Sequence, residues 1–307
     1  MRILFIFLDG VGLGTDDPAT NPLARATMPA LSHLLEGHKL IASAAPFIGR
    51  RASLFALDAS LGVPGLPQSA TGQAALLTGL NVPEQVGEHY GPKPNPPVAK
   101  LLAADNLFIQ LRRAGRSAAL LNAYPPRYFD GVDSGRRLYS SIPLAVTAAG
   151  NRLFNQDDLF LGKAISADFT GEGWANMLGI RETPILEPRA SGFRLAQLAR
   201  EYDFSLFEYW ASDYAGHKQD MPWALRQLDV LDDVLKGLVN EADEETLVLV
   251  TSDHGNMEDL STRRHTLAPV PALLIGSQSA RRTFGHGLGD IAGVTPAILR
   301  VLQVPAS

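Results

Sequence analysis

Short runs of consecutive apolar residues are the feature that most constrains the fold of this chain. The first run, Arg2–Leu8, consists of β-favouring residues and stops at Asp9, as a buried parallel strand does. Three later runs have the same character: Phe204–Tyr209, Thr246–Thr251 and Val270–Ile275. We predict that each of these four runs forms a strand in the interior of the protein.

Segments with helical spacing alternate with these runs. The predicted helices are Met28–Gly37, Thr71–Thr78, an amphipathic helix ending at Arg113, Phe193–Tyr202, Pro222–Asn240 and Val294–Leu302. Further strand candidates are Leu40–Ala44, Leu54–Leu57 and Ser117–Asn122. This alternation predicts an α/β fold, in which helices sandwich a mostly parallel sheet. We expect residues 1–307 to form one domain. The pattern weakens over 124–187, which we predict to be a small insertion or lid.

Charge and composition narrow the classes of partner and site. The net charge of −5 provides no basic surface for nucleic acid or for an acidic membrane. The chain has no cysteine, so any metal must be held by oxygen and imidazole ligands. The apolar start is too short for a transmembrane helix. We therefore expect a cytoplasmic protein with no nucleic-acid or membrane partner.

Three aspartates follow predicted strands by a few residues, and three histidines lie close to them in sequence. They are Asp9, Asp213, Asp253, His217, His254 and His265. In parallel sheets, ligands bind outside the carboxyl ends of the strands, so we expect these side chains to meet at one edge. Carboxylate and imidazole ligands without sulfur suit Mn²⁺ or Zn²⁺, and Mg²⁺ is also possible.

Each of these residues also has a simpler interpretation when it is taken alone. An aspartate after a strand is usually a turn or helix-capping residue, and a single histidine is usually a surface or core residue. The conjunction of all six at comparable positions favours a metal site, because carboxylates packed this closely would repel one another without cations.

Five short segments that contain these residues or Ser69 occur along the chain in the following order: FLDGVGLG at Asp9, QSATGQ at Ser69, DYAGH at Asp213, SDHGN at Asp253 and RHTLAPVP at His265. On these segments the chain resembles the alkaline phosphatase superfamily, in particular its branch of cofactor-independent phosphoglycerate mutases and phosphopentomutases. The resemblance implies an alkaline-phosphatase-like fold, two divalent metal ions and phosphoryl transfer.

The resemblance also implies roles for individual residues. One metal ion would be held by Asp213, His217 and His265, and the other by Asp9, Asp253, His254 and Ser69. Ser69 is then the expected nucleophile, with Thr71 as the alternative. A helix-capping role for Ser69 is the structural alternative.

The chain departs from the mutases in the middle. Only 143 residues separate Ser69 from Asp213 (213 − 69 − 1), so a full cap domain does not fit, and Gln73 occupies a position where the mutases have histidine. Without a closing cap, water can reach a phosphorylated enzyme. We therefore expect a phosphomonoesterase or phosphodiesterase that acts through a phosphoserine on a small phosphorylated substrate.

Two other functions stay open. One is a phosphomutase with a reduced cap, and the other is a non-catalytic relative that binds a phosphorylated ligand. Lys163 and Arg264 are the predicted substrate-binding pair, because cationic side chains match phosphate. His89 and His286 are candidate acid–base groups.

Overall fold

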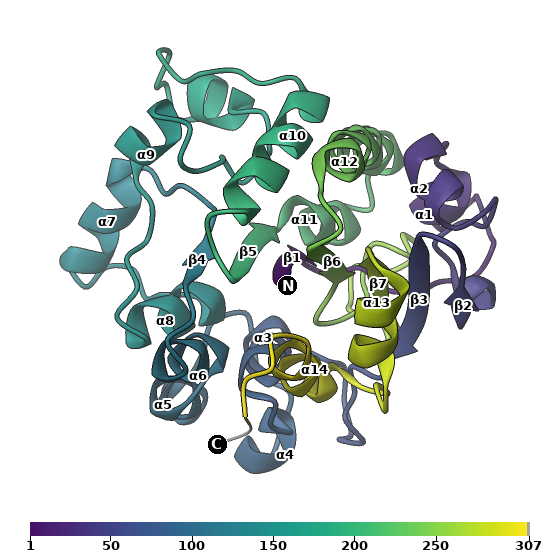
Figure 1. The fold of residues 1–307 in the computed structure, drawn as a ribbon, viewed down its shortest axis with the longest axis horizontal. Coiled ribbons are helices and arrows are strands. Elements are labelled where there is room, and N and C mark those ends of the chain that lie inside the picture. The colour runs from purple at the N-terminus through teal and green to yellow at the C-terminus, as the bar shows by residue number, and fades with distance from the viewer. Residues whose placement is uncertain (306–307) are drawn as a thin grey trace.

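A seven-stranded sheet forms the centre of the computed structural model, which describes residues 1–305 (Figure 1). The strand order is β2-β3-β7-β6-β1-β5-β4. The strands are β1 Arg2–Leu8, β2 Phe47–Ile48, β3 Ala52–Leu57, β4 Ala118–Leu120, β5 Phe204–Tyr209, β6 Thr246–Thr251 and β7 Val270–Ile275.

Strand β1 lies in the middle of the sheet because it can bury both of its faces. It pairs in parallel with β5 and β6, and β4 pairs in parallel with β5. The side chains of Leu4 and Ile6 join the core on one face, whereas Phe5 and Phe7 join the core on the other. Strand β7 is antiparallel to β6 and to β3, and β2 is antiparallel to β3. By these pairings, five of the seven strands run in one direction and only β2 and β7 run in the other, so the sheet is mixed but mostly parallel.

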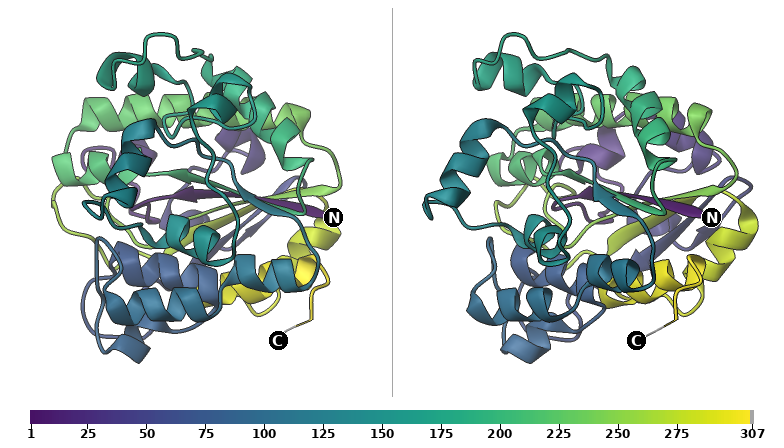
Figure 2. Two further views of the ribbon diagram at one scale, coloured as in Figure 1. Left: turned by 90° about the vertical axis from the view of Figure 1, so that its left-hand side faces the viewer. Right: turned by 60° about the vertical axis from the view of Figure 1, so that its left-hand side comes forward.

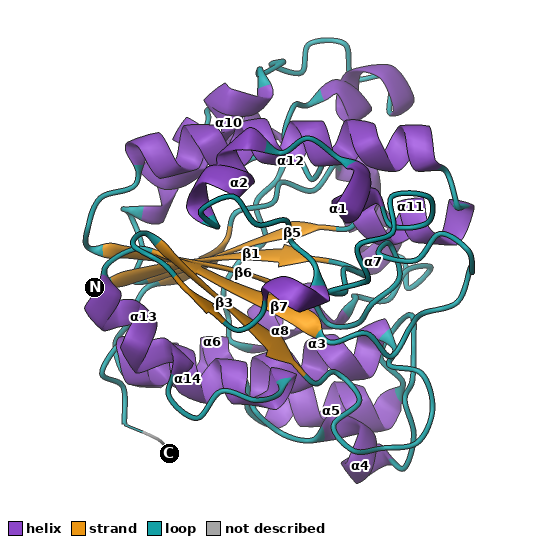
Figure 3. Ribbon diagram, turned by 90° about the vertical axis from the view of Figure 1, so that its right-hand side faces the viewer, coloured by secondary structure: helices purple, strands orange, loops and turns teal. Residues whose placement is uncertain are grey.

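Helices cover both faces of the sheet, as the two edge-on views show (Figures 2 and 3). One layer contains α1 Pro22–Arg25, α2 Pro29–Leu34, α10 Pro188–Ala199 and α12 Met221–Glu241. The opposite layer contains α3 Ser69–Thr78, α5 Pro96–Ala104, α6 Leu107–Arg113, α8 Ser141–Ala148, α13 Gln278–Gly285 and α14 Val294–Val301. The remaining α-helices are α4 Val82–Val86, α7 Pro126–Asp133, α9 Gln156–Phe160 and α11 Ala211–Lys218. This architecture confirms the predicted fold class.

Four of the predicted strands have the predicted bounds: Arg2–Leu8, Phe204–Tyr209, Thr246–Thr251 and Val270–Ile275. The strand predicted at Leu40–Ala44 is wrong, because Ala42–Ala44 forms a 3₁₀ turn in which the Ala44 amide bonds to the carbonyl of Ile41. The helix predicted to end at Arg113 is two helices, and the Asn106 side chain caps the second by accepting from the Ile109 amide. No helix within residues 1–305 is both long and apolar enough to cross a membrane.

The segment 124–187 contains three α-helices and a π-helical turn at Gly173–Met177. Helix α8 packs in the same helix layer as α3, and the Ser141 hydroxyl at its start donates to the carbonyl of Ala70 at 3.1 Å. On the other face, the buried ring of Phe169 stacks on Phe207 and Tyr209, with centroids 4.7 and 4.9 Å apart. The segment is thus attached to both faces, and its role as a lid stays a prediction.

Candidate metal centre

All six predicted ligands lie in the loops or the helix that follow three strands of the sheet, β1, β5 and β6. Asp9 follows β1, Asp213 lies in the first turn of α11 after β5, and Asp253 follows β6. His254 and His265 belong to the connection between β6 and β7. Because β6 and β7 are antiparallel neighbours, this connection begins and ends at the same edge of the sheet.

The first ligand group consists of Asp213, His217 and His265, whose ligand atoms all lie within 4.8 Å of one another. His217 lies one helical turn after Asp213, and its Nε2 is 3.2 Å from the Asp213 carboxylate. Nε2 of His265 is 3.7 Å from the other oxygen of that carboxylate.

Backbone carbonyls fix the orientation of both imidazoles in this group. Nδ1 of His217 lies 2.8 Å from the carbonyl of Arg263, and Nδ1 of His265 lies 2.7 Å from the carbonyl of Pro67. Since a carbonyl can only accept, each Nδ1 carries the proton and each Nε2 presents its lone pair to the cluster. Such outer hydrogen bonds are typical of histidines that bind metals.

The second ligand group contains Asp9 and His254, and the carboxylate of Asp213 also lies within 4.8 Å of their ligand atoms. His254 Nε2 is 3.4 Å from Asp9 and 3.6 Å from Asp253. The rings of His254 and His265 stack with centroids 3.7 Å apart, so the two groups adjoin. All six predicted ligands are thus brought together, with Asp213 between the groups.

The electrostatics of this cluster fit bound cations. Burial raises the pKa of Asp9 well above its ordinary value, and repulsion from Asp253 and Asp213 raises it further. The pKa of Asp253 is raised in the same way, first by burial and then by Asp213. Burial also lowers the pKa of His254, which keeps it neutral as a metal ligand must be. In addition, the buried Oδ1 of Asp9 has no hydrogen-bond partner within the described chain. The residues present therefore fit divalent metal ions.

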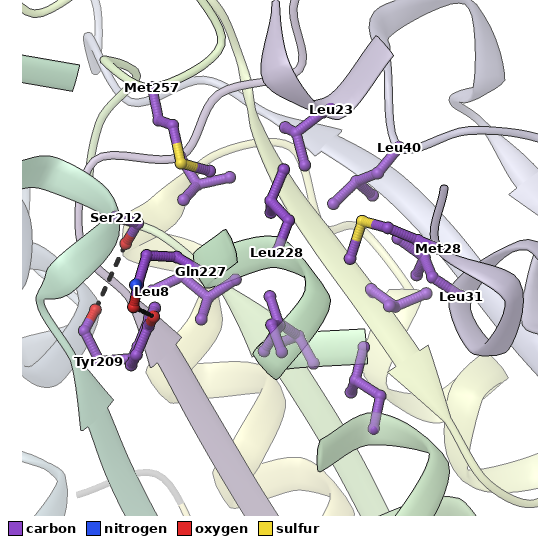
Figure 4. Close-up of a pocket in the computed structure, with 15 residues that line it drawn as sticks. Leu8, Leu23, Met28, Leu31, Leu40, Tyr209, Ser212, Gln227, Leu228 and Met257 are labelled. Atoms are coloured by element: carbon purple, nitrogen blue, oxygen red, sulfur yellow. Dashed lines mark hydrogen bonds between the residues drawn. The ribbon is translucent and has the colours of Figure 1, made fainter. Parts of the chain in front are cut away.

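The backbone after β1 permits this close approach only because residue 10 is glycine. Gly10 has a φ of 65°, and a Cβ atom there would lie 2.5 Å from Oδ1 of Asp213. The Ser212 hydroxyl donates to the carbonyl of Asp9 at 2.6 Å and so joins the start of α11 to the β1 loop. Figure 4 shows Ser212 beside Tyr209 at a small internal cavity of about 20 Å³, which is lined mainly by apolar side chains and is too small for a substrate.

The two candidate nucleophiles have different surroundings. Ser69 is the first residue of α3, and its hydroxyl lies 3.0 Å from Nε2 of His254. The hydroxyl of Thr71 is engaged by the backbone instead, since it lies 3.2 and 3.3 Å from the carbonyls of Gln68 and Tyr90 and accepts from the Tyr90 amide. Ser69 therefore adjoins the ligand cluster, whereas Thr71 connects α3 to a neighbouring loop.

A cleft of about 700 Å³ opens beside the first ligand group. Its lining includes His217 and His265, together with Arg263, Arg264 and His89. Among the residues described, neither arginine forms an ion pair with a carboxylate. Arg264 of the predicted substrate-binding pair thus borders the cleft.

The other predicted substrate residue does not line this cleft. Lys163 is exposed just after α9, and its charge helps to lower the pKa of Asp158, after the larger effects of the Arg152 and Asn155 hydrogen bonds. His286 follows α13, where its carbonyl accepts from Arg300.

Four polar residues around the centre were missed by the sequence analysis or given no role by it. The side-chain amide of Asn256 donates to Oδ1 of Asp213 at 2.6 Å, and the side-chain amide of Gln73 donates to Asp253 at 3.2 Å. Glu258 is buried and accepts from the backbone amides of Gly12 and Asn256. Glu208 near the end of β5 accepts from the Tyr124 hydroxyl at 3.4 Å, and burial raises its pKa to about 7. A charged residue inside the apolar run FSLFEY was the available signal for Glu208.

Comparisons with known sequences agree with this geometry. The sequence model of a family described as the Metalloenzyme superfamily matches residues 192–306, which include five of the six ligands. A 2,3-bisphosphoglycerate-independent phosphoglycerate mutase from Antithamnion sp. is 26% identical over 47% of this chain and 31% of its own length. The mutase from Laribacter hongkongensis is 32% identical over 35% of this chain and 22% of its own length. The chain thus spans less than a third of the length of these relatives.

Solved structures with the same fold extend along the whole chain. The alkaline phosphatase from the Antarctic bacterium TAB5 has a TM-score of 0.58 at 13% identity, covering 99% of this chain and 98% of the phosphatase. The phosphoglycerate mutase of Leishmania mexicana has a TM-score of 0.52 at 12% identity, covering 100% and 96%. At these identities the likeness concerns the fold.

Proposed function

We propose that the chain is a metalloenzyme of the alkaline phosphatase superfamily and that it hydrolyses phosphate esters through a phosphoserine on Ser69. The observation that supports this most directly is the Ser69 hydroxyl, which lies 3.0 Å from Nε2 of His254 at the start of α3. A hydroxyl needs activation to act as a nucleophile, and an adjacent metal site provides it.

Two divalent cations would be held by the six clustered side chains. Asp213, His217 and His265 would bind one ion, and Asp9, Asp253, His254 and Ser69 would bind the other. Mn²⁺ or Zn²⁺ suits these ligands best, and Mg²⁺ is a further candidate. When bound, the ions would neutralise the carboxylates and stabilise charge on the attacking and leaving oxygens.

The residues of the chain would then divide the reaction between them. Ser69 Oγ would lose its proton and form a bond to phosphorus while the bond from phosphorus to the ester oxygen breaks. The leaving oxygen would take up a proton and depart as an alcohol, and the N-terminal end of α3 would face the phosphoryl oxygens. Water then splits the phosphoserine and releases phosphate. Arg264 and Arg263 line the cleft beside the first ligand group, where they would contact the rest of a small phosphorylated substrate.

Hydrolysis is preferred over mutase chemistry because the metal centre lies beside an open cleft. A mutase must keep water from its phosphorylated serine, and only 143 residues (213 − 69 − 1) lie between Ser69 and Asp213 to build a cover. A mutase activity with a reduced cap, formed by 124–187, is the second candidate, since the sequence relatives are phosphoglycerate mutases.

The decisive experiment measures phosphate release and covalent labelling together. Purified chain with Mn²⁺ or Zn²⁺ would be incubated with a panel of phosphate mono- and diesters, and a phosphorus-labelled substrate would be quenched in acid after a short time. We expect free phosphate and a label on the peptide containing Ser69. Ser69→Ala should lose several powers of ten in rate but keep both ions, whereas Thr71→Ser should stay active.

Three results would change the proposal. Label on Thr71 would move the nucleophile by two residues. An active Ser69→Ala enzyme would favour direct attack by water. Isomerised phosphate ester without free phosphate would favour the mutase.

A further inference from the structure

The carboxylate of Glu258 lies in the interior, between three backbone segments that carry metal ligands. The residue is 2% exposed, and no lysine, arginine or histidine in residues 1–305 pairs with it. Its Oε2 accepts from the Gly12 amide at 2.9 Å and from the Asn256 amide at 2.7 Å. One oxygen thus joins the loop after β1, which carries Asp9, to the loop after β6.

The other carboxylate oxygen of Glu258 contacts the third backbone segment, which carries His265. Oε1 accepts from the hydroxyl of Thr266, the residue after His265. The Thr266 amide in turn donates to the carbonyl of Gly255 at 2.9 Å. The carboxylate leaves no free space beside residue 12, because a Cβ atom there would lie 2.5 Å from Cδ of Glu258.

A buried carboxylate without a cation is costly, and hydrogen bonds offset that cost only where their donors are fixed in place. Here the three donors belong to segments that bear Asp9, His254 and His265. Asn256, whose amide Glu258 holds, also donates its side chain to the carboxylate of Asp213. Glu258 therefore acts on the first ligand group through both His265 and Asp213.

We propose that Glu258 is a positioning residue that holds Asp213 and His265 in place for the first metal ion. This inference rests on the proposed two-metal function. It concerns the chain's own loops, and it predicts that the two ions differ in their dependence on Glu258.

The second ligand group should be less sensitive, because separate contacts hold it. Asp253 accepts from the amide of Gly10 at 3.4 Å and from the side chain of Gln73 at 3.2 Å. The hydroxyl of Ser252 accepts from the Val11 amide at 2.9 Å and lies 3.0 Å from the carbonyl of His254. None of these contacts passes through Glu258.

The test is a calorimetric titration of the metal-free full-length chain with Mn²⁺, in the absence of substrate. For the wild type we expect two ions. In Glu258→Met the affinity for one ion should fall about 10- to 100-fold, as when other residues that orient metal ligands are removed, and the second affinity should stay within about threefold. Glu258→Gln should retain most of the affinity, because its amide oxygen can still accept from Gly12 and Asn256. Comparison with His265→Ala identifies the ion that is weakened.

A matched pair of smaller changes guards against a Glu258→Met chain that does not fold. Thr266→Val removes only the contact to the His265 segment and should weaken the same ion. Ser252→Ala should weaken the other ion instead. Thermal melting of each metal-free variant monitors the fold.

Three outcomes would overturn the inference: unchanged affinity in both Glu258→Met and Thr266→Val, equal weakening of both ions, or Glu258→Gln as damaging as Glu258→Met. Two ions in the wild type together with any of these would leave the proposed function intact. A wild type that binds fewer than two ions would refute the two-metal function and this inference together.

Discussion

Replacing Glu208 by glutamine should stabilise the metal-free chain at neutral pH. Burial raises the pKa of Glu208 to about 7 from an ordinary value of 4.5, so its ionised form is disfavoured in the folded state. A group with a raised pKa contributes stability below pH 4.5, and that contribution is lost as the pH rises towards 7. Glutamine removes the charge and still offers an oxygen to the Tyr124 hydroxyl.

The magnitude follows from the two pKa values. Their difference of about 2.5, at about 1.36 kcal/mol per unit of pKa, corresponds to at most about 3 kcal/mol above pH 7. The Glu208 side chain keeps partial access to solvent, which reduces the expected effect to about 2 kcal/mol.

Urea unfolding with a chelator present would measure this effect at pH 4.5, 6 and 8. The variant should gain on the wild type as the pH rises, with most of the gain complete by pH 7. Glu201→Gln is the matched control, because Glu201 is exposed just before the same strand, and it should change stability by less than about 0.5 kcal/mol. Parallel pH profiles for the wild type and Glu208→Gln would refute the reasoning.

Three more predictions follow from the same structure. The metal-free chain should lose stability as the pH rises from about 4, because the raised pKa values of Asp9 and Asp253 favour their protonated forms, and Mn²⁺ should suppress this loss in thermal melts. Asp253→Asn should abolish turnover and weaken one ion in a Mn²⁺ titration, yet raise the melting temperature of the metal-free chain at pH 8; a lower melting temperature would contradict the repulsion argument. Arg281→Met should lower the free energy of unfolding in urea by about 3 kcal/mol, because the buried guanidinium donates to the carbonyl of Ala52 and to neighbouring groups of the β2–β3 hairpin. The matched control Arg282→Met, at an exposed position, should lower it by less than about 0.5 kcal/mol.

The main strands and the clustering of the six candidate ligands could be predicted because their signals are local. The runs that became β1, β5, β6 and β7 consist mainly of apolar residues, and Asp9, Asp213 and Asp253 follow three of them within a few residues. The residues that support the ligands could not be predicted in this way. Glu258 accepts from the Gly12 amide, which lies 246 residues away in the sequence, and no spacing rule links these two positions. Only the family resemblance favoured Ser69 over Thr71 as the nucleophile, because the local sequence does not show that the loop at Tyr90 engages the Thr71 hydroxyl. Lys163 and Arg264 were paired as substrate-binding residues on their charge alone, and the charge of a side chain does not indicate how far it lies from the metal centre.

The position of β1 between β5 and β6 has a consequence for how the chain folds during synthesis. Ile3 pairs with Phe204 on one side and with Leu247 on the other, so β1 leaves the ribosome about 200 residues before its neighbouring strands are synthesised. Such distant pairing slows folding and leaves an apolar segment exposed in the meantime. Asp9 likewise meets its partner carboxylates only once residues 213 and 253 have emerged. A nascent chain arrested before β6 should therefore associate with chaperones, and the metal centre would be among the last parts of the protein to form.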